Sequence, residues 1–308
     1  MAESESTAPG RAARPDTPRN RRPVGLIVLA LFVLAAAAIA WRIDRDTHHP
    51  RLQEVTVAVP GLTHEVDVLQ LSDLGGIHFG AQQSQLEALI AGRRFDTVVL
   101  TGDILGVEDY SAVWELGALA KAHSARVWYL PGNHDLRPVG AGLAERGVPT
   151  LPQDRAVVLA DFDPQGKQAA LVYGRNSDTI ATAKGLGAKL LVIASHTPPD
   201  THRLAAGLAL GGGTHIFIAG HTHGGQIRLP FIGALGAPLS WPYEQRAPAR
   251  GNEMTVLPDL KGRFVDGMYV RDGQRIFVSQ GLDANTTGIR FGAQAEIVAY
   301  RFVPAPAK

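Results

Sequence analysis

The sequence predicts an α/β sandwich preceded by a single transmembrane helix. Short apolar runs rich in Val, Ile and Leu alternate with helical patterns, and strands dominate near the C-terminus. One long uncharged apolar run near the N-terminus stands apart from this alternation. The predicted organisation is a disordered cytoplasmic tail (1–23), a transmembrane signal anchor (24–41), a linker (42–54), a folded domain (55–303) and a short tail (304–308).

The elements of the folded domain are predicted from the period of their apolar residues. Strands are expected over 55–59, 66–71, 97–101, 126–130, 156–160, 169–173, 190–194, 215–219, 264–270, 275–279 and 295–302. Helices are expected over 83–92, 110–123, 139–146, 178–187 and 200–208. A Pro-rich segment over 231–262 interrupts the pattern. It is interpreted either as an irregular crossover packed on the core or as a functional loop, in which Trp241 and Tyr243 line an apolar pocket or contact the membrane.

The apolar run over 24–41 is long enough to cross a bilayer. As a helix it would extend roughly 27 Å, close to the ~30 Å of the hydrocarbon core. More arginines precede the run than follow it. They are Arg11, Arg14, Arg19, Arg21 and Arg22 before it, and Arg42 and Arg45 after it. The positive-inside rule therefore predicts that the N-terminus lies in the cytoplasm and the domain outside. A cleaved signal peptide is the alternative, because Ala38-Ile39-Ala40 resembles a cleavage site.

The composition excludes several functional classes. The chain has no cysteine, which excludes disulfides, thiolate metal sites and a cysteine nucleophile. Its formal net charge is only +1, so a broad basic face for nucleic acid is not expected.

Clusters of Asp, Asn and His follow the predicted strands. They are Asp73, Asp103, Asn133-His134-Asp135, His196 and His221-Thr222-His223. Ligands of open α/β sheets bind outside the carboxyl ends of the strands, so these side chains are expected to converge at one sheet edge. Carboxylate, imidazole and amide donors without thiolate suit Mn²⁺, Fe²⁺, Zn²⁺ or Mg²⁺, and the sequence leaves the choice of ion open.

The ordered set Ser72-Asp73, Gly102-Asp103, Gly132 to Asp135, Ser195-His196 and Gly220 to His223 resembles the calcineurin-like metallophosphoesterase family. The resemblance covers about 55–302 and implies a four-layer α/β/β/α sandwich. The run AGHTHGGQIRLP from Ala219 to Pro230, with Phe277 to Leu282, is similar to the membrane-anchored bacterial branch, which includes phosphodiesterases.

The resemblance also implies a site with two divalent metal ions. The first would be held by Asp73, Asp103, His223 and His78, and the second by Asp103, Asn133, His196 and His221, with Asp103 bridging. A metal-activated hydroxide would attack phosphorus in line. His134 would protonate the leaving oxygen or stabilise charge, with Asp135 as its orienting partner.

The chain departs from the family at the first motif, Asp-x-His. It reads Ser72-Asp73-Leu74-Gly75-Gly76-Ile77-His78, which is interpreted as an insertion of Gly75, Gly76 and Ile77. Either the glycines let the loop return His78 to the metal, or one ligand of the first site is missing.

The favoured functional hypothesis is an extracytoplasmic phosphodiesterase acting on an envelope or lipid-linked phosphoester. One alternative is a catalytically impaired envelope binding module that keeps the fold. A pyrophosphatase of the UDP-2,3-diacylglucosamine type is another, and the predicted topology argues against it because such substrates are cytoplasmic. The sequence does not predict an oligomeric state.

Overall fold

The computed structural model describes residues 22–106, 109–231, 233–234, 253–254, 264–271, 273–284 and 288–306. The chain divides into two compact units, 1–41 and 42–308. Most of the segment over 231–262, including Trp241 and Tyr243, lies outside the described residues, as does most of the predicted N-terminal tail.

Helix α1 (Arg22–His48) contains the predicted transmembrane segment. Of the helices in the described part of the chain, it alone is long and apolar enough to cross a membrane. It does not end at Trp41, because helical structure continues through the expected linker to His48, and β1 (Arg51–Val59) begins three residues later. Within the second unit, Asp46 Oδ2 accepts the Gly292 N–H at 2.6 Å and Thr47 Oγ1 accepts the Arg290 N–H at 2.9 Å. These contacts explain why 42–48 is ordered helix and not linker.

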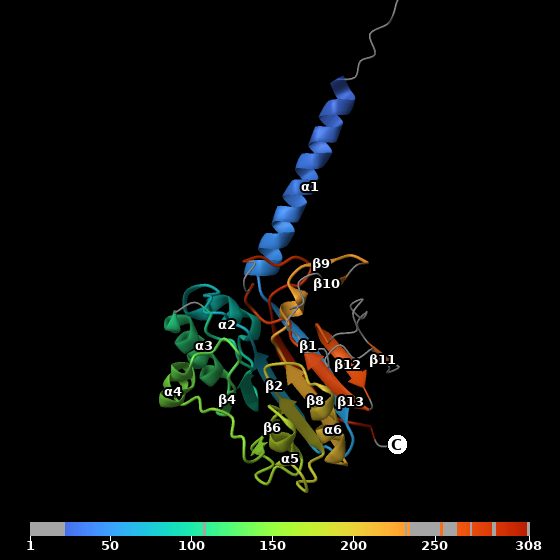
Figure 1. The fold of residues 1–308 in the computed structure, drawn as a ribbon. Coiled ribbons are helices and arrows are strands. Elements are labelled where there is room, and N and C mark those ends of the chain that lie inside the picture. Colours follow the sequence, from blue (N-terminus) through green and yellow to red (C-terminus); the bar gives the residue numbers. More distant parts are fainter. Residues whose placement is uncertain are drawn as a thin grey trace, which may run out of the picture. The chain divides into compact units, whose positions relative to one another are not determined.

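The first sheet has five strands in the order β1-β14-β2-β3-β4. The others are β14 (Glu296–Pro304), β2 (Val66–Leu71), β3 (Thr97–Leu100) and β4 (Val127–Tyr129). β2, β3 and β4 run parallel, so their carboxyl ends share one edge. Helices α2 (Ser84–Ile90), α3 (Tyr110–His123) and α4 (Arg137–Glu145) follow in the chain and gather beside this sheet (Figure 1).

The second sheet has seven strands in the order β11-β12-β13-β8-β7-β6-β5. They are β11 (Glu253–Met254), β12 (Gly267–Arg271), β13 (Gln274–Val278), β8 (Thr214–Ala219), β7 (Leu190–Ala194), β6 (Ala169–Tyr173) and β5 (Val157–Val158). β6, β7, β8 and β13 are parallel. Helices α5 (Ser177–Ala181) and α6 (Thr201–Ala209) belong to this half, and β9 (Arg228–Leu229) and β10 (Gly233–Ala234) form a separate antiparallel pair.

Three apolar cores hold the layers together. Val66 and Val68 of the first sheet pack in one cluster with Val192 and Ile216 of the second. A second cluster joins the first sheet to α2, α3 and α4, and a third joins the second sheet to α5 and α6. Because strand residues point alternately to opposite faces, each sheet buries both faces. The structure therefore confirms the predicted four-layer α/β/β/α sandwich.

Local signals explain where several helices begin and end. Asp109 caps α3 by accepting the Ser111 N–H at 2.9 Å. Asn176 and Thr179 form a capping box at the start of α5. That helix ends at Ala181, before the predicted boundary at 187, and Gly185 beyond it has a φ of +80°, which a right-handed helix does not allow.

Candidate metal centre

The candidate residues come together where strands of both sheets end. Each follows the last residue of a strand by a few positions: Asp73 after β2, Asp103 after β3, Asn133 after β4, His196 after β7, and His221 and His223 after β8. Backbone hydrogen bonds fix these loops to each other, from Asp73 N–H to Gly102 O at 2.9 Å and from Gly220 N–H to His196 O at 2.9 Å. The predicted convergence is therefore present, but strand ends of two sheets contribute to it and not those of one sheet.

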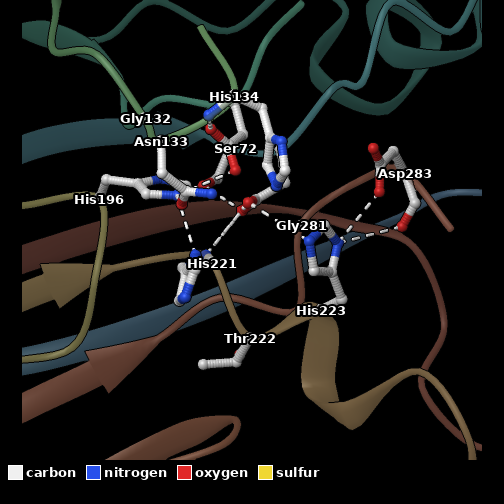
Figure 2. A network of polar contacts seen from close by, with 12 residues as sticks. Ser72, Gly132, Asn133, His134, His196, His221, Thr222, His223, Gly281 and Asp283 are labelled. Atoms are coloured by element: carbon white, nitrogen blue, oxygen red, sulfur yellow. Dashed lines mark hydrogen bonds and ion pairs between the residues drawn. The ribbon is translucent and has the colours of Figure 1, made fainter. Parts of the chain in front are cut away.

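One half of the centre is a tight cluster around His196 (Figure 2). Its Nε2 lies 2.9 Å from Asn133 Oδ1, 3.0 Å from Asp103 Oδ2 and 3.1 Å from His221 Nδ1. The opposite nitrogen, Nδ1, lies 2.9 Å from the Thr101 carbonyl, so it carries a proton and donates it. In the neutral ring, Nε2 then has a lone pair that faces the oxygens of Asn133 and Asp103, an arrangement that a proton on the ring or a cation between these atoms would satisfy.

The protonation of this cluster reflects the same crowding. Burial lowers the pKa of His196, but contact with Asp103 and the charge of Asp73 outweigh it and raise the pKa to about 9. Burial and the neighbouring His196 lower the pKa of His221 to about 3. Burial acts to raise the pKa of Asp103, yet its contact with His196 leaves the pKa below its usual value. A proton on His196 thus neutralises the site, and a divalent ion can replace it.

The donor set fits a divalent metal. Ligand atoms of Asp103, His196 and His221 all lie within 4.8 Å of one another. Asp103 Oδ2 is buried, and its nearest side-chain partner among the described residues is His196 Nε2 at 3.0 Å. The other Asp103 oxygen accepts the His134 N–H at 2.8 Å. A buried carboxylate oxygen whose neighbours are imidazole nitrogens is a suitable ligand for a hard or borderline cation.

The other half of the centre, around Asp73 and His223, is looser. The buried Asp73 carboxylate accepts the Ser72 hydroxyl at 2.5 Å and the His221 N–H at 3.0 Å. His223 Nε2 lies 3.8 Å from Asp73 Oδ1, while its Nδ1 lies 3.1 Å from Asp283 Oδ1 (Figure 2). Asp283 therefore accepts a hydrogen bond from the Nδ1–H of His223, which leaves the Nε2 lone pair facing Asp73.

Both acid and base in this half have shifted pKa values. Burial raises the pKa of Asp73, only partly opposed by the nearby His223 and His196. Burial acts to lower the pKa of His223, but Asp283 and Asp73 raise it above its usual value. In both halves, the raised pKa of one histidine favours positive charge beside the buried carboxylates.

The residues with candidate ligands also have an unusual backbone. Asp73, Asp103, His221 and His223 have left-handed φ values of 53°, 50°, 72° and 50°. Such angles cost of the order of 1–3 kcal/mol each in a residue other than glycine and persist only where the surroundings fix them. The loops are packed tightly enough to do so, since a Cβ at Gly132 would lie 2.0 Å from Asp103 Oδ1.

His134 stands at a cavity beside the centre. The cavity has a volume of about 490 Å³ and is lined by Asp103, His134, His223 and Asp283, together with apolar Ile77 and Leu105. A group bound there would meet His134 and the candidate ligands Asp103 and His223 at the same time. This placement fits the predicted role of His134 as a proton donor to a leaving group.

Asp135 does not have the surroundings expected of an orienting partner for His134. Its Oδ1 accepts the N–H groups of Ile104 and Leu105, each at 3.0 Å. Its Oδ2 accepts the Gly132 N–H at 2.9 Å and the Tyr129 hydroxyl at 3.0 Å. The carboxylate thus ties the loop after β4 to the loop after β3, and this corrects its predicted role to loop positioning.

His78 is not brought to the centre. Its Nδ1 lies 2.8 Å from Glu115 and its Nε2 lies 3.0 Å from Asp109, and the ring is 37% exposed. The hydrogen bond to Asp109, with that to Glu115, raises the pKa of His78. The inserted glycines therefore carry His78 to the start of α3, and the interpretation in which one family ligand is missing agrees with this geometry.

Two residues near the centre escaped the sequence analysis as site residues. Asp283 contacts His223 as described. Arg290 is fully buried and donates to the carbonyls of Gln280 and Asp283 at 2.7 and 2.8 Å, and to that of His223 at 3.4 Å. Both lie in the stretch after β13, where the quoted motif ended at Leu282, and no spacing rule connects that stretch to His223.

The fold and this cluster define a metal-binding α/β/β/α sandwich. A sequence model described as calcineurin-like phosphoesterase matches residues 66–225. The chain belongs to this family, and it is a metal-dependent hydrolase of phosphoric esters.

Two proteins of Bacillus subtilis (strain 168) are similar to it, and both are named uncharacterized metallophosphoesterase. YkuE is 28% identical over 217 residues, which cover 67% of each chain. YkoQ is 22% identical over 291 residues, which cover 88% of this chain and 97% of YkoQ.

Proposed function

We propose that the protein hydrolyses phosphodiesters of the cell envelope, with lipid-linked phosphoesters as the substrate class, outside the cytoplasm. The observation that carries the hydrolytic part is the set of acceptor atoms around His196 Nε2, because these atoms can hold a cation and one of them belongs to Asp103, which lines the cavity together with His134.

In this proposal Asp73, Asp103 and His223 hold one divalent ion, and Asp103, Asn133, His196 and His221 hold a second. Bound there, the ions would polarise the phosphoryl group and lower the pKa of water. The protein's own contribution is positioning. Thr101 and Asp283 fix the rings of His196 and His223 so that the lone pairs of their Nε2 atoms face the carboxylates.

His134 acts on the leaving group. Its backbone is fixed by the hydrogen bond to Asp103, and its side chain lines the cavity. It would donate a proton to the departing oxygen, which is worth typically 10²- to 10⁴-fold in rate. A phosphodiester needs this help because its alkoxide leaving group is a strong base.

The lipid-linked substrate is supported by the composition of the cavity wall. Ile77, Leu105 and Ala284 give it an apolar side, and Thr47 and His48 from the last turn of α1 also line it. Thr47 and His48 follow the predicted membrane segment over 24–41 by only six and seven residues.

The orientation proposed for the membrane segment rests on the arginines that precede it. The chain has no cysteine, so a single Asp154→Cys variant at a side chain that is 76% exposed gives a clean reporter. Labelling by a membrane-impermeant maleimide on intact cells is the expected result. Labelling only after lysis would contradict the extracytoplasmic placement.

The hydrolytic proposal is tested on the full chain in detergent micelles. We expect Mn²⁺-dependent hydrolysis of bis(p-nitrophenyl) phosphate and two bound ions by mass spectrometry of the metal content. His221→Ala should lose activity, whereas the matched His202→Ala on α6 should keep it. The second candidate function is a binding module without catalysis, because Gly75 stands where the family motif has a histidine ligand. At most one bound ion and no turnover would favour this second candidate.

The substrate class needs its own comparison. A phosphodiester lipid in mixed micelles should be cleaved with a higher kcat/KM than its deacylated headgroup. Equal values for the two would contradict the lipid-linked class and leave phosphodiester hydrolysis intact. Cleavage of nucleotide-sugar pyrophosphates in preference to both would favour the pyrophosphatase alternative.

A further inference from the structure

The first metal site lacks a family ligand, and the structure shows what fills the space. Gly75 stands at the position where Asp-x-His would place its histidine, counting from Asp73. A Cβ built on Gly75 would lie 2.0 Å from Asp283 Oδ2 and 2.6 Å from Asp283 Cγ. The two side chains therefore cannot be present together, and Asp283 stands where the histidine would begin.

We propose that the Asp283 carboxylate serves the first metal site in place of the missing histidine. This inference rests on the proposed metal centre but not on its substrate. It assigns Asp283 two tasks, one for each carboxylate oxygen. Oδ1 fixes the ring of His223, and Oδ2 adds a third negatively charged oxygen to the surroundings of Asp73 and Asp103.

The backbone around Asp283 is anchored to the same site. The Asp283 N–H donates to the Asp73 carbonyl at 2.6 Å, and the Asp283 carbonyl accepts Arg290 Nε at 2.8 Å. On the opposite side, the Gly75 N–H donates to the Asp103 carbonyl at 3.1 Å. Both partners of the close approach are thus tied to ligand residues, so their contact belongs to the architecture of the centre.

The side chain is also open to an ion. Asp283 is 14% exposed and lines the cavity with Asp103, His134 and His223. His78, the rival from the sequence, is bound to Asp109 and Glu115 on another element. A site with Asp73, Asp103 and Asp283 beside one histidine is harder and more anionic than the family pattern, which shifts its preference toward Mn²⁺ or Mg²⁺ relative to Zn²⁺.

The test measures metal content and Mn²⁺ affinity of the full chain in detergent, without relying on turnover. Asp283→Ala should reduce the content from two ions to one, or weaken the first-site Mn²⁺ affinity about tenfold or more. Asp283→Asn separates the two tasks, since it keeps an oxygen for His223 Nδ1 but removes the charge. We expect the Asn variant to be weakened as well, while His78→Ala keeps both ions.

A swap provides a second test. Gly75→His alone should bind the first-site ion poorly because its Cβ overlaps Asp283. Gly75→His combined with Asp283→Gly should bind the first-site ion more tightly than Asp283→Gly alone. Thermal unfolding in chelator confirms that each variant is folded before metal is added.

Unchanged two-ion binding by Asp283→Asn would overturn the proposal, because Asp283 would then only orient His223. A double variant no better than Asp283→Gly would contradict the shared-space argument. If the wild-type chain binds two ions and hydrolyses the diester, the proposed function holds whatever the Asp283 variants show. If the wild-type chain binds no metal, the proposed function itself is wrong.

Discussion

The two halves of the centre are built differently. Around His196, three acceptor atoms from three other loops lie within 3.1 Å of one nitrogen. Around His223, the nearest Asp73 oxygen is 3.8 Å away, and the ring is fixed by a residue outside the family motifs. The tight half is specified by short motifs directly after strands. The loose half depends on a loop insertion and a distant compensating residue, so motif matching describes it incompletely.

The largest effect is expected at the residue that the two halves share. Asp103→Ala should remove both ions and reduce phosphodiesterase activity by at least about 10³-fold, since it deletes the bridging carboxylate and the acceptor for the His134 N–H. Metal analysis and initial rates measure this. Asp161→Ala, at a carboxylate that is 87% exposed, is the matched control. Retention of one tightly bound ion by Asp103→Ala would show that the halves are independent.

The tight half should exchange a proton for its metal. Because the pKa of His196 is raised to about 9, the ring is protonated below that pH and must lose its proton to bind an ion. Mn²⁺ affinity should therefore rise roughly tenfold per pH unit from pH 6 and level off above pH 9. Calorimetry at pH 7.5 in two buffers of different ionisation enthalpy should show proton release, which vanishes at pH 10. An affinity independent of pH would contradict the geometry assigned to His196.

A smaller effect is expected where the loops of the tight half are joined. Asp135→Asn turns one acceptor oxygen into a donor that faces two donors, at a cost of about 3 kcal/mol in the free energy of unfolding. Thermal unfolding should show a Tm lower by roughly 6–12 °C. Asp154→Asn, on an exposed carboxylate, should leave it unchanged. An unchanged Tm with an altered pH–rate profile would instead restore Asp135 as the partner of His134.

The smallest effect is expected at His78, outside both halves. His78→Ala should keep both ions and lower stability by less than about 1 kcal/mol, because its ion pairs are largely exposed. The pKa of His78 is raised in the folded state, so this contribution is fully present below about pH 6.5 and disappears as pH rises through the raised value. The Tm difference should therefore be larger at pH 5.5 than at pH 9. Loss of an ion would place His78 in the loose half after all.

The sequence predicted the tight half because its residues follow strands with little intervening chain. Strands 66–71, 169–173 and 190–194 and helix 110–123 have the predicted bounds, since β-branched residues and capping signals favour them locally. Asn133, His196 and His221 then meet because parallel strands share an edge.

The helix over 42–48, the position of His78 and the role of Asp283 could not be predicted, because they depend on contacts between residues far apart in the sequence. The polar residues over 42–48 read as a linker, yet Asp46 and Thr47 bind the loop around Arg290 far along the chain. The glycines before His78 allowed the loop either to return to the metal or to leave it, and the pairing with Asp109 and Glu115 decided the outcome. Asp283 was not predicted as a site residue, because Gly75, which it contacts, has no side chain that a sequence pattern could pair with a carboxylate.

The left-handed backbone of Asp73, Asp103, His221 and His223 has a consequence for evolution and engineering. Selection for heat resistance in a metal-free medium would favour glycine at each of these positions, because glycine adopts such angles without steric cost. Every such replacement would delete a candidate ligand. Stabilising this enzyme by library screening therefore requires metal and substrate in the selection, or the most stable survivors will be the inert ones.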